Sequence, residues 1–149
     1  MPSDTRHFAA ARRASRRSTC VRGNKTGAVI VHRGRLIGRG ASVCSPNGEA
    51  YGEPIVSCPR KAAGAGTGER YELCSPIHAE EAAIIAALKT LAAKAASSDL
   101  RGAILYLTGH YYACWRCAAL LRFVGITDIR IDPETALTNP DCHHRPPES

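Results

Sequence analysis

The feature that most constrains the fold is a set of four side chains that lie far apart in the sequence and make chemical sense only together. His78 is followed two residues later by Glu80, and Cys114 and Cys117 form a Cys-x-x-Cys pair. One imidazole and two thiolates are an accepted ligand set for a tetrahedral zinc that keeps its fourth position open for water. Zinc makes that water acidic enough to attack near neutral pH, and a nearby carboxylate that is not a ligand can move its proton. The sequence therefore predicts a catalytic zinc with Glu80 as the proton shuttle. The predicted ligands are His78, Cys114 and Cys117.

Local patterns can bring these groups together. The Ser-Pro pair at residues 75–76 is typical of a helix start. Residues 79–96 are apolar on nearly every face, which predicts a buried helix, and residues 103–108 predict a strand that returns towards the histidine. Cys114 and Cys117 fall at i and i+3 at the start of a second helical pattern, so both sulfurs share one face. A helix N-terminus also favours the thiolate form.

The order of elements indicates a single α/β domain over residues 1–149, because strands that alternate with helices favour a layered fold. The arginines of the first helix (Arg12, Arg13, Arg16 and Arg17) are expected to face water. The other expected segments are a basic N-terminal helix and connector (1–20, helical over 5–18), a hairpin (27–31 and 35–40), a long loop insert that walls the pocket (41–73), a helix (118–124), a strand (126–131) and an irregular tail (132–149).

The net charge of +7 is concentrated near the N-terminus. Residues 1–40 hold ten Lys and Arg against one acidic residue, whereas the remaining 109 residues hold ten against twelve. Such a segment can attract an anionic substrate, nucleic acid or an acidic partner, or it can be a solvated helix face or a transit peptide. Nucleic acid is retained as a partner, although it is not the favoured one.

Composition excludes several classes of protein. No run approaches 18 apolar residues without a charge, so no membrane partner or membrane span is expected, and no secretory signal pattern is visible. The seven cysteines are an odd number, which suits metal binding and catalysis better than a disulfide framework. We therefore expect a cytoplasmic protein.

The motifs resemble those of the cytidine deaminase superfamily, and most of all its deoxycytidylate deaminase branch. The residues that carry the resemblance are Gly-Ala-Val-Ile-Val at 27–31, His-Ala-Glu at 78–80 and the segment 108–117 with its Cys-x-x-Cys pair. The combination of H-x-E with C-x-x-C is the signature of zinc nucleobase deaminases. Cys20 before the first strand and Cys74 shortly before the histidine fit the same branch. The similarity covers about residues 5–131.

This resemblance implies a three-layer α/β/α fold with a mixed sheet of about five strands. It also implies a homo-oligomer, a zinc between two helix N-termini and a base pocket lined by the first strand. The aromatic residues near the second motif could stack on a base or belong to the core. The candidate substrate contacts are Ala28, Val29, Ser42, Asn47, Ala79, Tyr111, Tyr112 and Trp115.

Three departures from the family pattern concern the substrate. Ala113 stands where the family has a proline before the first cysteine, and the turn at 109–113 is longer than usual. The asparagine that contacts the sugar in the family has no clear counterpart, so Ser42 or Asn47 would have to replace it. The substrate can therefore differ from deoxycytidylate.

Several alternatives remain open. The motif pair could hold a closed structural zinc with a fourth protein ligand, as in an interaction module without activity, or could be a redox dithiol. Arg22 and Lys25 could meet a phosphate or form a solvated connector, and His110 could be a second proton relay or a surface histidine. A second, structural zinc could use some of the residues Cys20, Cys44, Cys58, Cys74, Cys142, His143 and His144, or these thiols could be inert.

The expected activity is therefore zinc-dependent hydrolytic deamination of a cytosine ring, in a small nucleotide such as deoxycytidylate or in a nucleoside. The alternatives are deamination of another aminated heterocycle and deamination of cytosine in single-stranded nucleic acid.

Overall fold

The computed structural model describes residues 2–20, 25–43, 49–50, 53–54, 58–66, 69–73, 77–110 and 112–136. In chain order the elements are α1 (Pro2–Ser15), β1 (Gly27–His32), β2 (Arg35–Ala41), β3 (Glu49–Ala50), β4 (Glu53–Pro54), α2 (Pro59–Ala62), a 3-10 turn (Tyr71–Leu73), α3 (Ala79–Ala93), β5 (Ile104–Thr108), α4 (Trp115–Phe123), β6 (Asp128–Ile131) and α5 (Pro133–Ala136).

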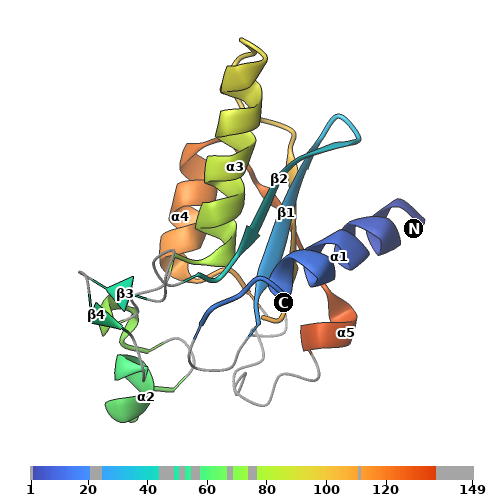
Figure 1. The fold of residues 1–149 in the computed structure, drawn as a ribbon. Helices are drawn as coiled ribbons and strands as arrows, with labels where there is room; N and C mark the ends of the chain where they lie inside the picture. Colours follow the sequence, from blue (N-terminus) through green and yellow to red (C-terminus); the bar gives the residue numbers. More distant parts are fainter. Residues whose placement is uncertain are drawn as a thin grey trace.

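A four-stranded mixed sheet in the order β2-β1-β5-β6 forms the middle of the fold (Figure 1). Strand β1 is antiparallel to β2 and to β5, and β5 is parallel to β6. The parallel pair needs a crossover, which α4 supplies. The expected layered α/β fold is confirmed, and the main sheet of the described residues has four strands where about five were expected.

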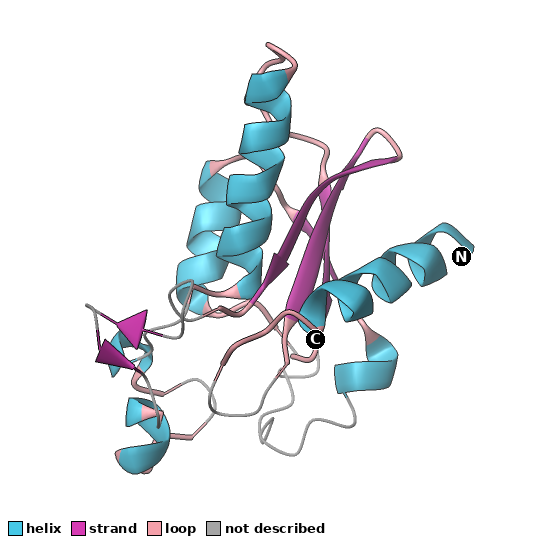
Figure 2. Cartoon of the chain, in the orientation of Figure 1, coloured by secondary structure: helices cyan, strands magenta, loops and turns pink. Residues whose placement is uncertain are grey.

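Helices cover both faces of the sheet, which gives three layers (Figure 2), and the alternation of side chains along β1 suits this arrangement. Ala28 and Ile30 point to the face that α3 and α4 cover. Val29 and Val31 point to the opposite face, where α1 packs with Tyr106. Because successive residues of a strand face opposite sides, a strand buried on both faces must be apolar throughout, as this one is.

Helix α3 lies unusually close to strand β2 because the strand presents glycines to it. A Cβ added at Gly40 would lie 2.2 Å from the carbonyl oxygen of Ala79, and one added at Gly38 would lie 2.3 Å from that of Ala83. The helix backbone therefore rests directly on the strand backbone. This contact fixes the first turn of α3, where the functional residues lie.

A buried carboxylate joins the two ends of the described chain. Asp132, fully buried, accepts hydrogen bonds from Arg12 Nε at 2.7 Å and Nη2 at 2.8 Å, and from Thr108 Oγ1 at 2.9 Å. The expectation that Arg12 faces water is therefore wrong. Its guanidinium ties α1 to the end of the sheet, whereas Arg13, Arg16 and Arg17 are exposed.

Other boundaries differ from the expectation. Helix α3 begins at Ala79 rather than at residues 75–76, and it is buried on one side only, since Ile85 is 46% exposed. The described parts of the insert form the short elements β3, β4, α2 and the 3-10 turn, and residues 133–136 of the expected irregular tail form α5. Within the described residues, no helix is long and apolar enough to cross a membrane.

Candidate metal centre and active site

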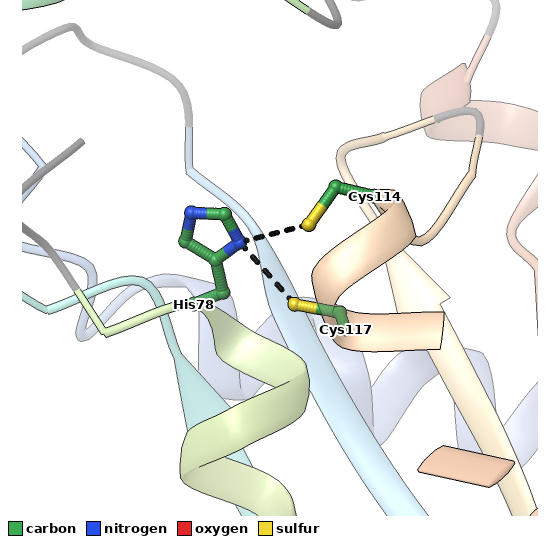
Figure 3. Close-up of side chains that lie close together, drawn as sticks. All are labelled: His78, Cys114 and Cys117. Atoms are coloured by element: carbon green, nitrogen blue, oxygen red, sulfur yellow. Dashed lines mark hydrogen bonds between the residues drawn. The ribbon is translucent and has the colours of Figure 1, made fainter. Parts of the chain in front are cut away.

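One imidazole and two thiols meet between the N-termini of α3 and α4 (Figure 3). His78 Nδ1 lies 3.3 Å from Cys117 Sγ and 3.5 Å from Cys114 Sγ. All three ligand atoms lie within 4.8 Å of one another. Both sulfurs are buried, whereas the histidine is partly exposed. Groups far apart in the sequence therefore converge as the motif spacing predicts.

The spacing and chemistry of these atoms fit zinc. A tetrahedral zinc with bonds of about 2.0 Å to nitrogen and about 2.3 Å to sulfur would separate nitrogen from sulfur by about 3.5 Å. The observed separations of 3.3 and 3.5 Å match that value. Three protein ligands of this type leave a fourth position for water or substrate.

Backbone pairing places the histidine. Ile77 exchanges two hydrogen bonds with Val43, at 2.8 Å and 3.0 Å, so the chain is extended immediately before the helix. His78 is then the N-cap residue of α3, with φ −71° and ψ 156°. Cys114 is the N-cap residue of α4, and it follows β5 after the turn at 109–113. Both ligand-bearing segments are thus helix starts, whose backbone N–H groups favour negative charge.

The two thiols ionise unequally because they share a hydrogen bond. The pKa of Cys114 is lowered, first by the hydrogen bond from Cys117 and then by the bond to His78, although burial opposes this. The pKa of Cys117 is raised because its thiol is the donor and is buried. One thiolate is therefore available for a metal cation without a large cost.

Glu80 lies one residue inside α3 and is 4% exposed. Burial raises the pKa of Glu80 to about 7, although a backbone hydrogen bond and the charge of His78 lower it. Glu80 does not belong to the group of His78, Cys114 and Cys117, which is the group of potential metal ligands among the described residues. A buried carboxyl with a pKa near neutrality, beside this cluster, can take up and release a proton at working pH.

The candidate substrate contacts are dispersed. Ala28 and Ala79 are fully buried and pack between the sheet and α3, whereas the side chain of Val29 packs on the other face against α1. Val29 therefore cannot line a pocket on the α3 side with its side chain. Trp115 is 74% exposed. Ser42 lies directly after β2, and Asn47 and Tyr111 lie outside the described residues.

The long turn after β5 brings two rings together. The ring centroids of His110 and Tyr112 are 4.9 Å apart in an edge-to-face arrangement. The pKa of His110 is lowered, chiefly by burial. His110 is therefore half-buried rather than a fully exposed surface histidine.

A second metal cluster is not found in the described part of the chain, where Cys20 and Cys58 join no group of metal-ligating side chains. The other proposed members, Cys44, Cys74, Cys142, His143 and His144, lie outside the described residues.

Two charged residues that the sequence did not single out, Glu81 and Arg116, lie beside the cluster. The Glu81 carboxylate accepts the backbone N–H of His78 at 2.9 Å and lies 3.0 Å from Arg116 Nε. An acid three residues after an N-cap is the usual signal of a capping box. The signal was hidden because the helix start was expected at residues 75–76.

A basic cleft of about 370 Å³ opens between α1, β2 and α3. Small residues form its floor, among them Ala14 and Gly40, and the exposed residues Arg13, Arg17 and Arg39 lie around it. Among the described residues that line it, none is acidic, so the cleft is suited to an anion.

Comparisons with known proteins agree with this geometry. The family model described as the cytidine and deoxycytidylate deaminase zinc-binding region matches residues 1–131. The apo crystal structure of dCMP deaminase from the cyanophage S-TIM5 gives a TM-score of 0.57 at 20% identity, over 91% of this chain and 88% of that chain. The complex of the same enzyme with dCMP and dUMP gives 0.56 at 19% identity, over 88% and 83%. No curated protein matches the sequence.

Proposed function

Because the chain belongs to the cytidine and deoxycytidylate deaminase family, we propose that it is a zinc-dependent hydrolase that removes the amino group of a cytosine ring in a small nucleotide or nucleoside. The observation that carries this proposal is the convergence of His78 Nδ1 with the sulfurs of Cys114 and Cys117 at zinc-ligand spacing. The buried carboxyl of Glu80 beside this cluster distinguishes the site from a purely structural one.

The proposed roles follow from the donor set. His78, Cys114 and Cys117 hold zinc, which supplies a nucleophile from water near neutral pH when it is bound. Glu80 takes a proton from the attacking water and gives it to ring N3. The water oxygen bonds to C4, its remaining proton passes through Glu80 to the amine, and the C4–N bond breaks, so that the products are ammonia and a uracil ring. A carboxyl with a pKa of about 7 can perform both transfers.

The test separates metal binding from proton transfer. Glu80→Ala should keep zinc at the wild-type stoichiometry and lose ammonia release by about 10²-fold or more. Cys114→Ala should lose both zinc and activity. Cys58→Ala, which removes a thiol outside the cluster, should keep both. Near-normal turnover in Glu80→Ala, on any cytosine compound, would overturn the assignment.

The proposed substrate is deoxycytidylate or a close analogue. The support is the shared fold with a dCMP deaminase and the basic surface near the site, which suits a phosphate. A panel of cytosine, cytidine, deoxycytidine and both monophosphates, followed by ultraviolet absorbance, should give the highest kcat/KM with a monophosphate. A preference for the free base, or no activity on any of these compounds, would favour another aminated heterocycle as the substrate. The altered turn at 109–113 also suggests this alternative.

A second candidate is deamination of cytosine in single-stranded nucleic acid, which the basic cleft favours. Three arginine–phosphate contacts, by Arg13, Arg17 and Arg39, would give a slope of about −2 in log K against log salt. A triple variant should flatten that slope, in which Arg13, Arg17 and Arg39 are all replaced by glutamine. The control Arg101→Gln, at an exposed arginine outside the cleft, should not. No oligonucleotide binding at low salt would exclude this candidate.

We also propose that the protein is a homo-oligomer. Trp115 and Phe123 on α4 are 74% and 89% exposed, and a second copy of the chain would bury this apolar surface. Sedimentation velocity should show a species larger than 15.9 kDa, and Phe123→Ser should shift it towards the monomer. A monomer in the wild type would refute this.

A further inference from the structure

One carboxylate connects the two segments that carry the metal ligands. Glu81 Oε2 accepts the backbone N–H of His78 at 2.9 Å, which holds the N-cap of α3. Glu81 Oε1 lies 3.0 Å from Nε of Arg116, and Nη2 of Arg116 lies 3.4 Å from Oε2. Arg116 belongs to the first turn of α4 and stands between the two cysteines in the sequence. The pair therefore bridges the imidazole-bearing and sulfur-bearing helix starts.

This ion pair is partly shielded from water. The side chains of Glu81 and Arg116 are 19% and 38% exposed, and the Nε atom of Arg116 is fully buried. Within the described chain, Nε makes no well-aligned hydrogen bond, so its proximity to the carboxylate is what offsets its burial. Removal of the carboxylate would leave a buried cationic nitrogen beside the two cysteines.

Helix stability does not explain the arginine. A cation in the first turn of a helix is opposed by the helix dipole, whereas an anion there is favoured. Glu81 in the first turn of α3 thus suits its own helix, but Arg116 in the first turn of α4 does not. The positive charge of Arg116 is favourable beside thiolate sulfurs, and the ion pair with Glu81 fixes its position. Groups that orient metal ligands from outside the ligand set commonly change metal affinity 10–100-fold when they are removed.

We propose that Glu81 and Arg116 are positioning residues that set the separation between His78 and the two sulfurs, and so the affinity of the site for zinc. This inference rests on the proposed function in one respect, namely that the cluster binds zinc. Neither residue is assigned contact with the substrate or with the reacting atoms.

The test is a double-mutant cycle on zinc affinity, measured by competition with a chromophoric chelator. Glu81→Gln keeps an oxygen that can accept the His78 N–H but removes the charge, and Arg116→Met keeps the length of the side chain but removes the guanidinium. Each should weaken zinc binding by about 10–100-fold. The double variant should bind zinc no more weakly than the weaker-binding of the two single variants, because each residue acts through the other. Arg116→Lys should recover part of the loss.

Two further measurements separate positioning from general stability. Asp99→Asn breaks an exposed ion pair with Arg101, at 2.6 Å, away from the cluster, and should leave zinc affinity unchanged. With saturating cobalt(II) in place of zinc, the visible absorption bands of Glu81→Gln should shift, because the ligand geometry has changed. The melting temperatures of the metal-free forms check that every variant is folded.

The outcomes are distinct. If the wild-type protein binds no zinc, the proposed function fails. If the wild-type protein binds zinc and both single variants match it in affinity and cobalt spectrum, the positioning role is wrong while the proposed function stands. Strictly additive losses in the cycle would also contradict the pair, because they would show that the two residues act separately.

Discussion

Substitution of Gly40 by alanine tests whether the contact between strand β2 and helix α3 places the functional residues. A Cβ at Gly40 would lie 2.2 Å from the Ala79 carbonyl oxygen, 2.4 Å from the Ala83 amide nitrogen and 2.9 Å from a backbone carbon of Ala82. Ala79 lies between His78 and Glu80, so any movement that relieves the clash moves both of these residues. Because every one of these neighbours is a backbone atom, no side-chain rotation can make room.

The size of the displacement follows from the contact distances. Ordinary contact begins at 3.4 Å, so the first turn of α3 must move by about 1.2 Å relative to β2. Overpacking of this kind costs about 1–3 kcal/mol of unfolding free energy. A displacement of about 1 Å at a catalytic group lowers the rate by about 10²-fold. Zinc affinity should fall as well, since ligand distances tolerate changes of only about 0.2 Å.

The matched control is Gly34→Ala, in the turn between β1 and β2. Gly34 has φ +76° and no atom within 4 Å of an added Cβ. Alanine there costs about 1–2 kcal/mol of backbone strain without touching α3. Ammonia release, zinc content and urea unfolding should show similar destabilisation in both variants but loss of activity in Gly40→Ala alone. Equal activity in the two variants would refute the argument that this contact places the site.

Two other perturbations have definite expected outcomes. Removal of zinc by a chelator should lower the unfolding free energy by about 2.7 kcal/mol relative to protein at 100 times the zinc dissociation constant, and calorimetry should show it as a lower melting temperature; no shift would contradict zinc binding. Asp132→Asn should cost about 3 kcal/mol in urea unfolding, because Arg12 loses a buried partner. Burial opposes ionisation of Asp132, but the hydrogen bonds from Arg12 and Thr108 outweigh it, so the pKa of Asp132 is lowered in the folded protein. The stabilisation is therefore complete above about pH 4 and is lost as the pH falls through the lower, folded pKa. The wild type should lose more stability than Asp132→Asn on acidification, and equal losses would refute the coupling.

The parts of the fold that depend on local pattern could be predicted from the sequence. The apolar run at 27–31 predicted strand β1, and the turn at Arg33-Gly34 predicted the hairpin, and both are present. The alternation of helices and strands gave the layered architecture. The convergence of His78 with Cys114 and Cys117 could be predicted because side chains that are proposed to bind one metal must meet, wherever they lie in the sequence.

The parts that depend on long-range partners could not be predicted. The Ser-Pro pair at 75–76 is a good local helix signal, but Ile77 pairs with Val43 and stays extended, so α3 begins at Ala79. The sequence neighbours of Arg12 predict a solvated side chain, yet its partner Asp132 lies 120 positions away in the chain. In both cases a contact made only in the folded chain overrides a correct local preference.

The ion pair between Arg12 and Asp132 has a consequence for the order in which the protein is assembled during synthesis. Helix α1 leaves the ribosome before the strands of the sheet, and its apolar face can dock on β1 as soon as that strand emerges. Its guanidinium has no carboxylate to meet until nearly the whole domain has been translated. The contact of Arg12 is therefore among the last that α1 can complete, and a product that stops short of residue 132 lacks this buried ion pair while it can keep the bond from Tyr106 to Asp4.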